Sequence, residues 1–237
     1  MKISLTVSSY TLDKLDFLIK MAGKNVLAVG AHADDVEIGC GGTVALHARN
    51  GDNVIILVMA ESFYTYYNGT VLRTKEEAER EERDAARILG AKELINLGFK
   101  NKEVPYSRES VESLNRVIDE YSIDIIYTHW YHDSHQDHRR TTQSVLAAGR
   151  YVKNILMYEP EYPAGRSYLG FRNQYYVDIT QIFHIKMEAL KQHKSQIRKY
   201  GEKMFLEAVE ARARHRGYEI GSRYAECFEV VRLLGEI

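Results

Sequence analysis

Short apolar runs alternate with longer amphipathic stretches along most of the chain. The apolar runs predict buried strands at residues 26–30, 53–60, 93–97, 123–128 and 154–158. Helical spacing of apolar residues, with glycines near the ends, predicts helices between them at residues 39–50, 75–89, 108–121 and 139–151. This alternation predicts an α/β fold, in which helices cover both faces of a mostly parallel sheet.

Both ends of the chain follow a different pattern. The spacing of apolar residues at 10–22 predicts a helix. Residues 160–180 are rich in glycine and tyrosine and contain two prolines, so they predict an irregular segment before two further helices. Because no stretch resembles a linker, we expect a single domain spanning residues 1–237.

Two clusters of histidine and aspartate directly follow predicted strands. One stands after the strand at 26–30, and the other after the strand at 123–128. The carboxyl ends of parallel strands meet at one edge of an α/β sheet, where binding sites are built. We therefore expect the two clusters to meet and to hold a metal ion. In chain order, the candidate residues are His32, Asp34, Asp35, His135, Asp137 and His138.

The residue types suit a catalytic metal centre. Catalytic zinc takes three protein ligands and keeps a fourth position open, and both histidine and aspartate are suitable ligands. We predict that His32 and Asp35, three residues apart in one loop, bind the metal together with His138. The same ligands accept other divalent first-row metals. Such a site lowers the pKa of bound water toward about 7, so that the water becomes a nucleophile.

The remaining members of the clusters have catalytic interpretations. Asp34 stands between the predicted ligands, and a carboxylate beside activated water is suited to general-base catalysis. A protonated His135 could stabilise an oxyanion or protonate a leaving amine. Asp137 could hydrogen-bond to His135 and fix its tautomer and charge. A metal, a base and an oriented cation together suit the hydrolysis of an amide or an ester.

Other interpretations compete with this one. An aspartate-rich loop is often a capped helix start, and two histidines with one carboxylate also suit non-haem iron oxygenases. The extra carboxylate of Asp34 favours hydrolysis. The glycine-rich run at 39–42 does not match the dinucleotide-binding pattern, so we expect it to allow close helix packing. The tyrosines at 64–67, together with Trp130 and Tyr131, are candidates for stacking on a sugar ring.

Composition limits the classes of partner and the cellular compartment that we expect for this protein. The chain has 237 residues and a formal net charge of -1, which gives no bias toward nucleic acid. No apolar run approaches the ~18 residues of a membrane span, and the N-terminus lacks the apolar core of a signal peptide. Two cysteines form no disulfide framework and fit a reducing compartment. We therefore expect a cytoplasmic protein with no nucleic-acid partner and no membrane span.

Two motifs resemble those of a known family. Residues 31–39 read Ala-His-Ala-Asp-Asp-Val-Glu-Ile-Gly, with Gly-Thr two residues further on, and residues 133–138 read Asp-Ser-His-Gln-Asp-His. In combination they resemble the PIG-L/LmbE-like zinc N-deacetylases, over about residues 25–230. The resemblance implies that residues 1–24, with the helix predicted at 10–22, form an N-terminal extension. The motifs are most similar to those of the bacillithiol-pathway deacetylases, because the segment 68–73 (Asn-Gly-Thr-Val-Leu-Arg) is also similar to a loop of that subgroup.

The resemblance implies a Rossmann-like fold and assigns roles to the site. It implies Zn²⁺ at the three predicted ligands and a general base at Asp34. It implies that His135 and Asp137 stabilise the tetrahedral intermediate or act as an acid. Arg73 matches a substrate-binding arginine of the subgroup, with Arg80 as the alternative position. The resemblance also implies a homo-oligomer, either a trimer or a hexamer.

The implied reaction removes the acetyl group from a small-molecule substrate, an N-acetylglucosamine-type sugar or sugar conjugate. Two other enzymatic interpretations remain open, an amidase of a thiol-sugar conjugate and a deacylase of a non-sugar amine. An interpretation from another class is a non-catalytic α/β domain that binds a sugar or a nucleotide. The presence of Asp34 beside the metal-binding residues argues against it, because a binding protein has no need of a general base.

Overall fold

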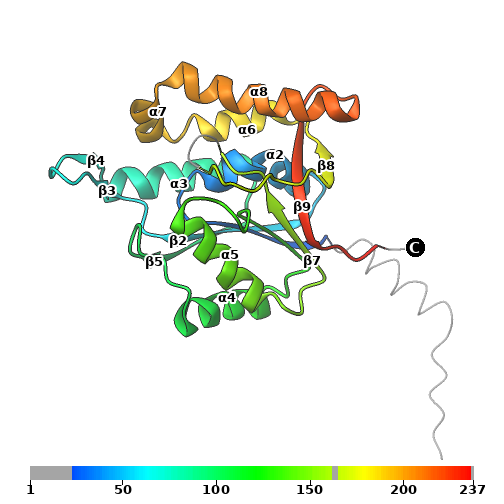
Figure 1. The fold of residues 1–237 in the computed structure, drawn as a ribbon, viewed down its shortest axis with the longest axis horizontal. Helices are drawn as coiled ribbons and strands as arrows, with labels where there is room; N and C mark the ends of the chain where they lie inside the picture. Colours follow the sequence, from blue (N-terminus) through cyan, green and yellow to red (C-terminus); the bar gives the residue numbers. More distant parts are fainter. Residues whose placement is uncertain (1–22, 162–164, 236–237) are drawn as a thin grey trace, which may run out of the picture.

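The computed structural model describes residues 23–161 and 165–235, and a seven-stranded sheet forms its centre (Figure 1). The predicted helix at 10–22 lies outside the described residues. The strand order is β5-β2-β1-β6-β7-β9-β8. In chain order, these strands are β1 (Asn25–Gly30), β2 (Asn53–Ala60), β5 (Glu93–Phe99), β6 (Ile125–Thr128), β7 (Asn154–Tyr158), β8 (Tyr175–Asp178) and β9 (Ala225–Arg232).

The strands from β5 to β7 are parallel, as the sequence predicts. From β1 the chain moves outward through β2 to β5, and then it returns to place β6 and β7 on the other side of β1. The strand order therefore reverses between β1 and β6. In open α/β sheets, ligands bind at this switch point, beyond the carboxyl ends of the strands.

Helices cover both faces of the sheet, which confirms the predicted fold class (Figure 1). Side chains of β1 alternate between two apolar cores, one shared with α2, α3 and α6 and the other with α4 and α5. Within the described part of the chain, no helix is long and apolar enough to cross a membrane. The helices are α2 (Asp35–Arg49), α3 (Lys75–Leu89), α4 (Arg108–Glu120), α5 (Gln136–Ala148), α6 (Phe183–Leu190), α7 (Lys194–Tyr200) and α8 (Glu202–Ile220).

The C-terminal third contains more strand structure than the sequence predicts. β8 lies inside the segment 160–180, for which we expected no regular structure, and β9 pairs antiparallel with both β7 and β8. Their sequences lack the signal of the parallel strands. β8 has only four residues, and Glu226 and Glu229 interrupt the apolar run of β9 although both side chains are buried in the fold.

The largest differences among the helices and loops lie near the two clusters. α2 and α5 begin at Asp35 and Gln136, several residues before their predicted starts, so that Asp34 and His135 are the N-cap residues. The loop predicted at 61–72 contains a short hairpin of β3 (Tyr64–Thr65) and β4 (Val71–Arg73), which projects from the body in Figure 1.

Trp130 belongs to the core and not to a sugar-binding surface. Its side chain is 1% exposed, and its indole N–H donates a hydrogen bond to Glu229 at 3.1 Å. Glu229 also accepts hydrogen bonds from the backbone and the guanidinium of Arg172. The prediction that Trp130 stacks on a sugar is therefore wrong, because the chain after β6 turns this side chain into the interior.

Candidate active site

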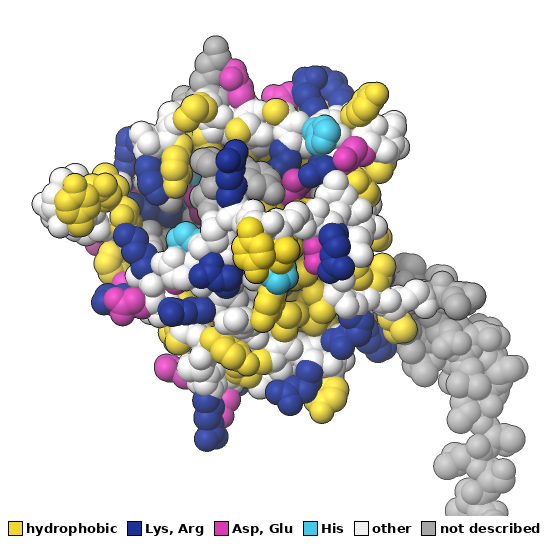
Figure 2. Space-filling view, in the orientation of Figure 1, with side chains coloured by type: hydrophobic (Ala, Val, Ile, Leu, Met, Phe, Trp, Pro, Cys, Tyr) yellow, Lys and Arg dark blue, Asp and Glu magenta, His cyan; other side chains and the backbone are white. Residues whose placement is uncertain are grey.

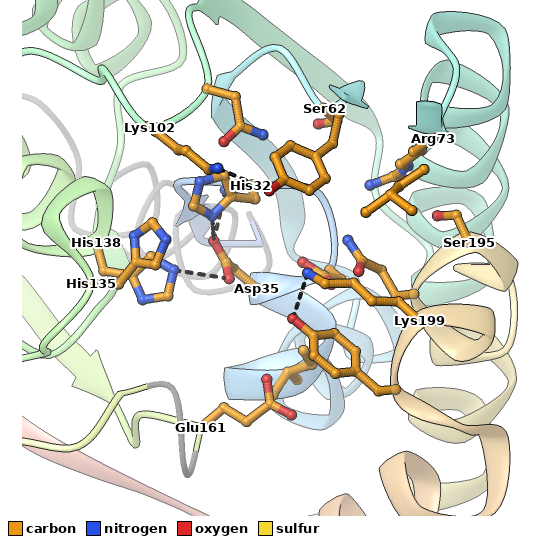
Figure 3. Close-up of a pocket in the computed structure, with 17 residues that line it drawn as sticks. His32, Asp35, Ser62, Arg73, Lys102, His135, His138, Glu161, Ser195 and Lys199 are labelled. Carbon is orange, nitrogen blue, oxygen red and sulfur yellow. Dashed lines mark hydrogen bonds and ion pairs between the residues drawn. The ribbon is translucent and has the colours of Figure 1, made fainter. Parts of the chain in front are cut away.

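The two predicted clusters meet at the switch point of the sheet. β1 and β6 are hydrogen-bonded neighbours, so the segments that follow them lie side by side. Figure 3 shows the side chains of His32 and Asp35 directed toward those of His135 and His138. The expectation that the clusters meet is therefore confirmed by their positions in the fold.

The three predicted ligands form a donor set that suits a divalent metal. The ligand atoms of His32, Asp35 and His138 all lie within 4.8 Å of one another. Asp35 Oδ2 is 3.4 Å from His32 Nδ1, and Asp35 Oδ1 is 3.4 Å from His138 Nε2. Burial lowers the pKa of His32, but Asp137 and Asp35 outweigh burial and raise it to about 10. The site thus stabilises positive charge, as binding of a metal cation requires.

Each of the two histidines predicted as ligands contacts a carboxylate through the ring nitrogen that does not face Asp35. Asp137 Oδ2 lies 3.1 Å from His32 Nε2, and Asp133 Oδ2 lies 2.9 Å from His138 Nδ1. In each ring, this leaves the other nitrogen facing Asp35. Carboxylates in this position orient histidine ligands and increase their basicity. The sequence motif contained Asp133, but spacing alone did not identify its role.

Other combinations of the same side chains are also compact enough to be considered as ligand sets. Two overlapping groups have ligand atoms within 4.8 Å of one another, namely His32–His135–Asp137 and His129–Asp133–His138. Each contains one of the two carboxylates that face a histidine from behind. We therefore retain the set predicted from the sequence, in which both of these carboxylates stay free to orient their histidines.

The environment of His135 differs from the one predicted. The Asp137 carboxylate bonds to His32 and accepts the backbone N–H groups of Lys102 at 2.7 Å and Val104 at 3.2 Å. It is the backbone N–H of Asp137 that donates to His135 Nδ1, at 3.2 Å. The neutral His135 ring therefore carries its proton on Nε2.

The surroundings of His135 favour its neutral form. Burial and the neighbouring His138 and His32 lower the pKa of His135 to about 4. The predicted contact of the Asp137 carboxylate with His135 is replaced by a contact with the Asp137 backbone N–H, while the carboxylate bonds to His32. A neutral ring with Nε2–H can still donate a hydrogen bond to a developing oxyanion.

Asp34 lines the pocket in an environment that suits a base. It is 8% exposed and has a left-handed backbone, with φ 116°, at the N-cap of α2. Burial and the negative charge of Asp35 raise the pKa of Asp34 to about 7, although His193 and Arg73 act in the opposite direction. A carboxylate with a raised pKa is well matched to proton transfer near neutral pH.

His129 is a site residue that sequence reasoning missed. It is buried at the end of β6, where its Nε2 lies 3.1 Å from Asp35 Oδ2 and accepts the Ala31 N–H at 2.9 Å. Its ring stacks on that of His138, with centroids 3.9 Å apart. His129 therefore packs against Asp35 and His138 and is not among the residues that line the cavity. Its place next to a predicted strand end was the signal that could have identified it.

A cavity of about 180 Å³ opens in front of these residues. Several Lys and Arg side chains lie around the hollow on this face of the molecule (Figure 2). Among the aromatic candidates, Tyr64 lines the cavity, whereas Tyr66, Tyr67 and Tyr131 are not among its lining residues. The lining residues are His32, Asp34, Asp35, Ile38, Ser62, Tyr64, Leu72, Arg73, Asn101, Lys102, His135, His138, Glu161, Ser195, Gln196, Lys199 and Tyr200.

Of the two arginines considered for substrate binding, Arg73 lines the cavity. Its side chain is 3% exposed, and Nη2 lies 3.2 Å from Glu81 Oε2. Glu81 also accepts hydrogen bonds from the backbone N–H and the hydroxyl of Ser195. Arg80 is exposed on α3 and does not line the cavity. The position of Arg73 is thus fixed by α3 and α7, on the side of the cavity opposite His135 and His138 (Figure 3).

The fold and these side chains define a hydrolase-type α/β protein with a candidate metal site at its switch point. Residues 27–149 match the family model described as "PIG-L: GlcNAc-PI de-N-acetylase". The chain therefore belongs to the PIG-L de-N-acetylase family, and it is an enzyme of the deacetylase class. The resemblance read from the two motifs is confirmed at the level of this family.

Individual relatives agree with this assignment. The chain is 32% identical to the uncharacterized deacetylase YaiS of Escherichia coli (strain K12) over 181 residues, covering 73% of this chain and 91% of the relative. It is 30% identical to the diacetylchitobiose deacetylase of Thermococcus kodakarensis over 236 residues, covering 92% and 88%. The crystal structure of the conserved protein TT1542 from Thermus thermophilus is 26% identical, with a TM-score of 0.77, and the match covers 90% of this chain and 97% of that one.

Proposed function

We propose that this protein is a zinc-dependent N-deacetylase that removes the acetyl group from an N-acetylglucosamine-type sugar or sugar conjugate. The observation that carries the proposal is the grouping of His32, Asp35 and His138 within 4.8 Å, with Asp34 beside them in the same cavity. The diacetylchitobiose deacetylase among its relatives supports an N-acetylated sugar as the substrate class.

The donor set of two histidines and one carboxylate fits zinc. When bound, zinc supplies Lewis acidity for the acetamide carbonyl and lowers the pKa of water. Asp34 accepts a proton from the attacking water as the new C–O bond forms. His135 donates its Nε2–H to the oxyanion. When the C–N bond breaks, the proton that Asp34 took from water passes to the leaving nitrogen, so that the products are acetate and the free amine.

The finer assignments form part of the same proposal. Arg73 contacts the substrate from the wall opposite His135, where Glu81 holds its guanidinium. The motif similarity to bacillithiol-pathway deacetylases makes an N-acetylglucosaminyl conjugate of that kind one substrate to compare. A homo-oligomer, a trimer or a hexamer, and a cytoplasmic location complete the proposal.

A substrate panel tests the proposal. We would measure release of free amine by the zinc-loaded protein from N-acetylglucosamine, diacetylchitobiose, an N-acetylglucosaminyl conjugate, an N-acetylated non-sugar amine and a thiol-sugar amide. We expect the highest kcat/KM on an N-acetylglucosamine derivative. A higher kcat/KM on the non-sugar amine or on the thiol-sugar amide would replace the proposed substrate class by that alternative. No turnover of any member would contradict the proposed substrate class and both alternative classes.

A further inference from the structure

Helix α2, whose first turn contributes to the candidate site, is broken in its interior. Cys40 has φ −145° and ψ 18°, which are not helical angles, so residues 35–39 and 41–49 form two helical pieces. A break of this kind leaves carbonyl groups without partners on one side and N–H groups without partners on the other. Because the glycine-rich middle of α2 is completely buried, water cannot take their place.

Charged side chains from the C-terminal third satisfy the backbone on both sides of the break. After it, Glu226 of β9 accepts the N–H of Gly42 at 2.9 Å, and both the N–H and the hydroxyl of Thr43 at 2.7 and 2.6 Å. Before it, Lys186 of α6 and Arg212 of α8 each donate to the carbonyl oxygen of Ile38 at 2.9 Å. At the break, a carboxylate therefore accepts the N–H groups of the second piece, and two cationic side chains donate to the last carbonyl of the first piece.

Two of these side chains, Lys186 and Glu226, also form an ion pair with each other. Lys186 Nζ lies 2.5 Å from Glu226 Oε1, and the two side chains are 2% and 3% exposed. Burial of two charges is unfavourable unless they are paired and their remaining hydrogen-bonding groups are satisfied. In this pair, the additional partners are the backbone groups of the broken helix. The charge pair is thus built around the break and is not a general contribution to the core.

The first piece of α2 has candidate catalytic residues at its start and the Lys186–Glu226 hydrogen-bond network at its end. Asp34 and Asp35 begin it, and the Ile38 residue whose carbonyl is held also lines the candidate cavity. Its approach to the sheet is close, because a Cβ at Gly39 would overlap the ring of Tyr158. A rotation of this piece would move the proposed base and the proposed ligand together.

We propose that Lys186 and Glu226 are positioning residues, which hold the first piece of α2 so that Asp34 and Asp35 face the cavity in the correct geometry. The catalytic roles of Asp34 and Asp35 in this proposal rest on the proposed function. Small misplacements of reacting groups cost large factors in rate, about 10²-fold for 1 Å. The network acts through the backbone of Ile38, Gly42 and Thr43, and neither charged side chain touches the cavity.

The test compares Glu226→Gln with Asp52→Asn in the full chain. Asp52 also accepts hydrogen bonds, from the Lys24 N–H and from His47, but it lies beyond the opposite end of α2. Three measurements are made: steady-state kinetics of acetate release, which give kcat and KM; the zinc dissociation constant from competition with a chelating dye; and amide hydrogen exchange of peptides covering residues 31–43. We expect Glu226→Gln to lower kcat at least tenfold with KM changed less than threefold, to weaken zinc binding about tenfold, and to accelerate exchange in 31–43. Asp52→Asn should leave all three unchanged.

The three measurements separate the two proposals. If the wild-type protein released no acetate, the proposed function would fail, whereas zinc affinity and hydrogen exchange would still test the positioning role. If Glu226→Gln folded with normal exchange, zinc affinity and kcat, the positioning role would be overturned.

If Glu226→Gln failed to fold, Thr43→Val would remove one hydrogen bond of the same network, and Thr43→Ser would keep the hydroxyl. Slower turnover and faster exchange in Thr43→Val, with recovery in Thr43→Ser, would support the positioning role. Equal values of kcat and exchange rate in the two variants would refute it.

Discussion

Replacement of Asp34 by asparagine separates catalysis from metal binding in the proposed site. Asp34 lies beside Asp35 in the cavity but is not one of the three predicted ligands. Asparagine is, with aspartate, among the non-glycine residues most often found at positive φ, so the backbone at φ 116° should persist. Asp34→Asn should therefore retain the fold and the bound zinc while it loses the base.

The expected effect follows from the role of a positioned base. General-base catalysis contributes about 10² to 10⁴ in rate, which corresponds to about 2.7–5.4 kcal/mol of transition-state stabilisation. Burial and Asp35 raise the pKa of Asp34 to about 7, and a bound cation would favour the ionised form. The wild-type kcat should therefore rise with pH to a plateau whose midpoint is at or below about pH 7. Asp34→Asn should lack this rise.

The assay is acetate release at saturating substrate, with zinc content determined on the same samples. Asp34→Asn should contain one zinc per chain and show kcat reduced by about 10² or more. The replacement Asp34→Ala is less informative, because alanine would also strain the left-handed backbone. If zinc-loaded Asp34→Asn kept the wild-type kcat and pH profile, the assignment of Asp34 as the base would be refuted.

Three further predictions concern other parts of the structure. Asp133→Asn should weaken zinc binding about 10- to 100-fold, measured by chelator competition, because Asp133 orients His138; unchanged affinity would contradict this role. Arg73→Met should raise KM for the best substrate about tenfold or more, whereas equal effects of Arg73→Met and exposed Arg80→Met would argue against specific contact. Burial raises the pKa of Glu229, but the guanidinium and backbone N–H of Arg172 and the indole of Trp130 outweigh burial and lower this pKa below its usual value. The charged form of Glu229 therefore stabilises the fold above the unfolded pKa, and this stabilisation is lost as pH falls through the folded pKa. Glu229→Gln should therefore lower Tm at pH 7, and the Tm difference from the wild type should shrink as the pH falls below the pKa of an unfolded glutamate. A Tm difference independent of pH would contradict the argument.

The five parallel strands and the helices between them are predicted well from the sequence. Parallel strands that are buried on both faces have continuous apolar sequences, which are easy to recognise. Glycines and charged amphipathic stretches separate these strands and show where the helices between them begin and end. β9 could not be recognised in this way, because the partners of Glu226 and Glu229 come from segments far apart in the sequence. From the sequence alone, a buried carboxylate in a strand cannot be distinguished from an exposed one, because the groups that pair with it are identified only in the folded structure.

Most members of the candidate site were predictable from the sequence, but the directions of their side chains were not. The clusters follow β1 and β6, so adjacency of these strands is sufficient to bring them together. Spacing suggested that Asp137 holds His135, yet the carboxylate turns to His32 and the backbone N–H faces His135. His129 follows a predicted strand end, but that position alone does not show that its ring packs against Asp35.

Acetate release from a panel of N-acetylglucosamine derivatives, measured with zinc-reconstituted and chelator-stripped protein side by side, tests the central claim most directly. The proposed function predicts release by the zinc-loaded protein, loss of release after chelation, and recovery when zinc is restored. Release that continues without metal would contradict the role of His32, Asp35 and His138. Absence of release from every derivative, with one zinc bound per chain, would contradict the proposed substrate class.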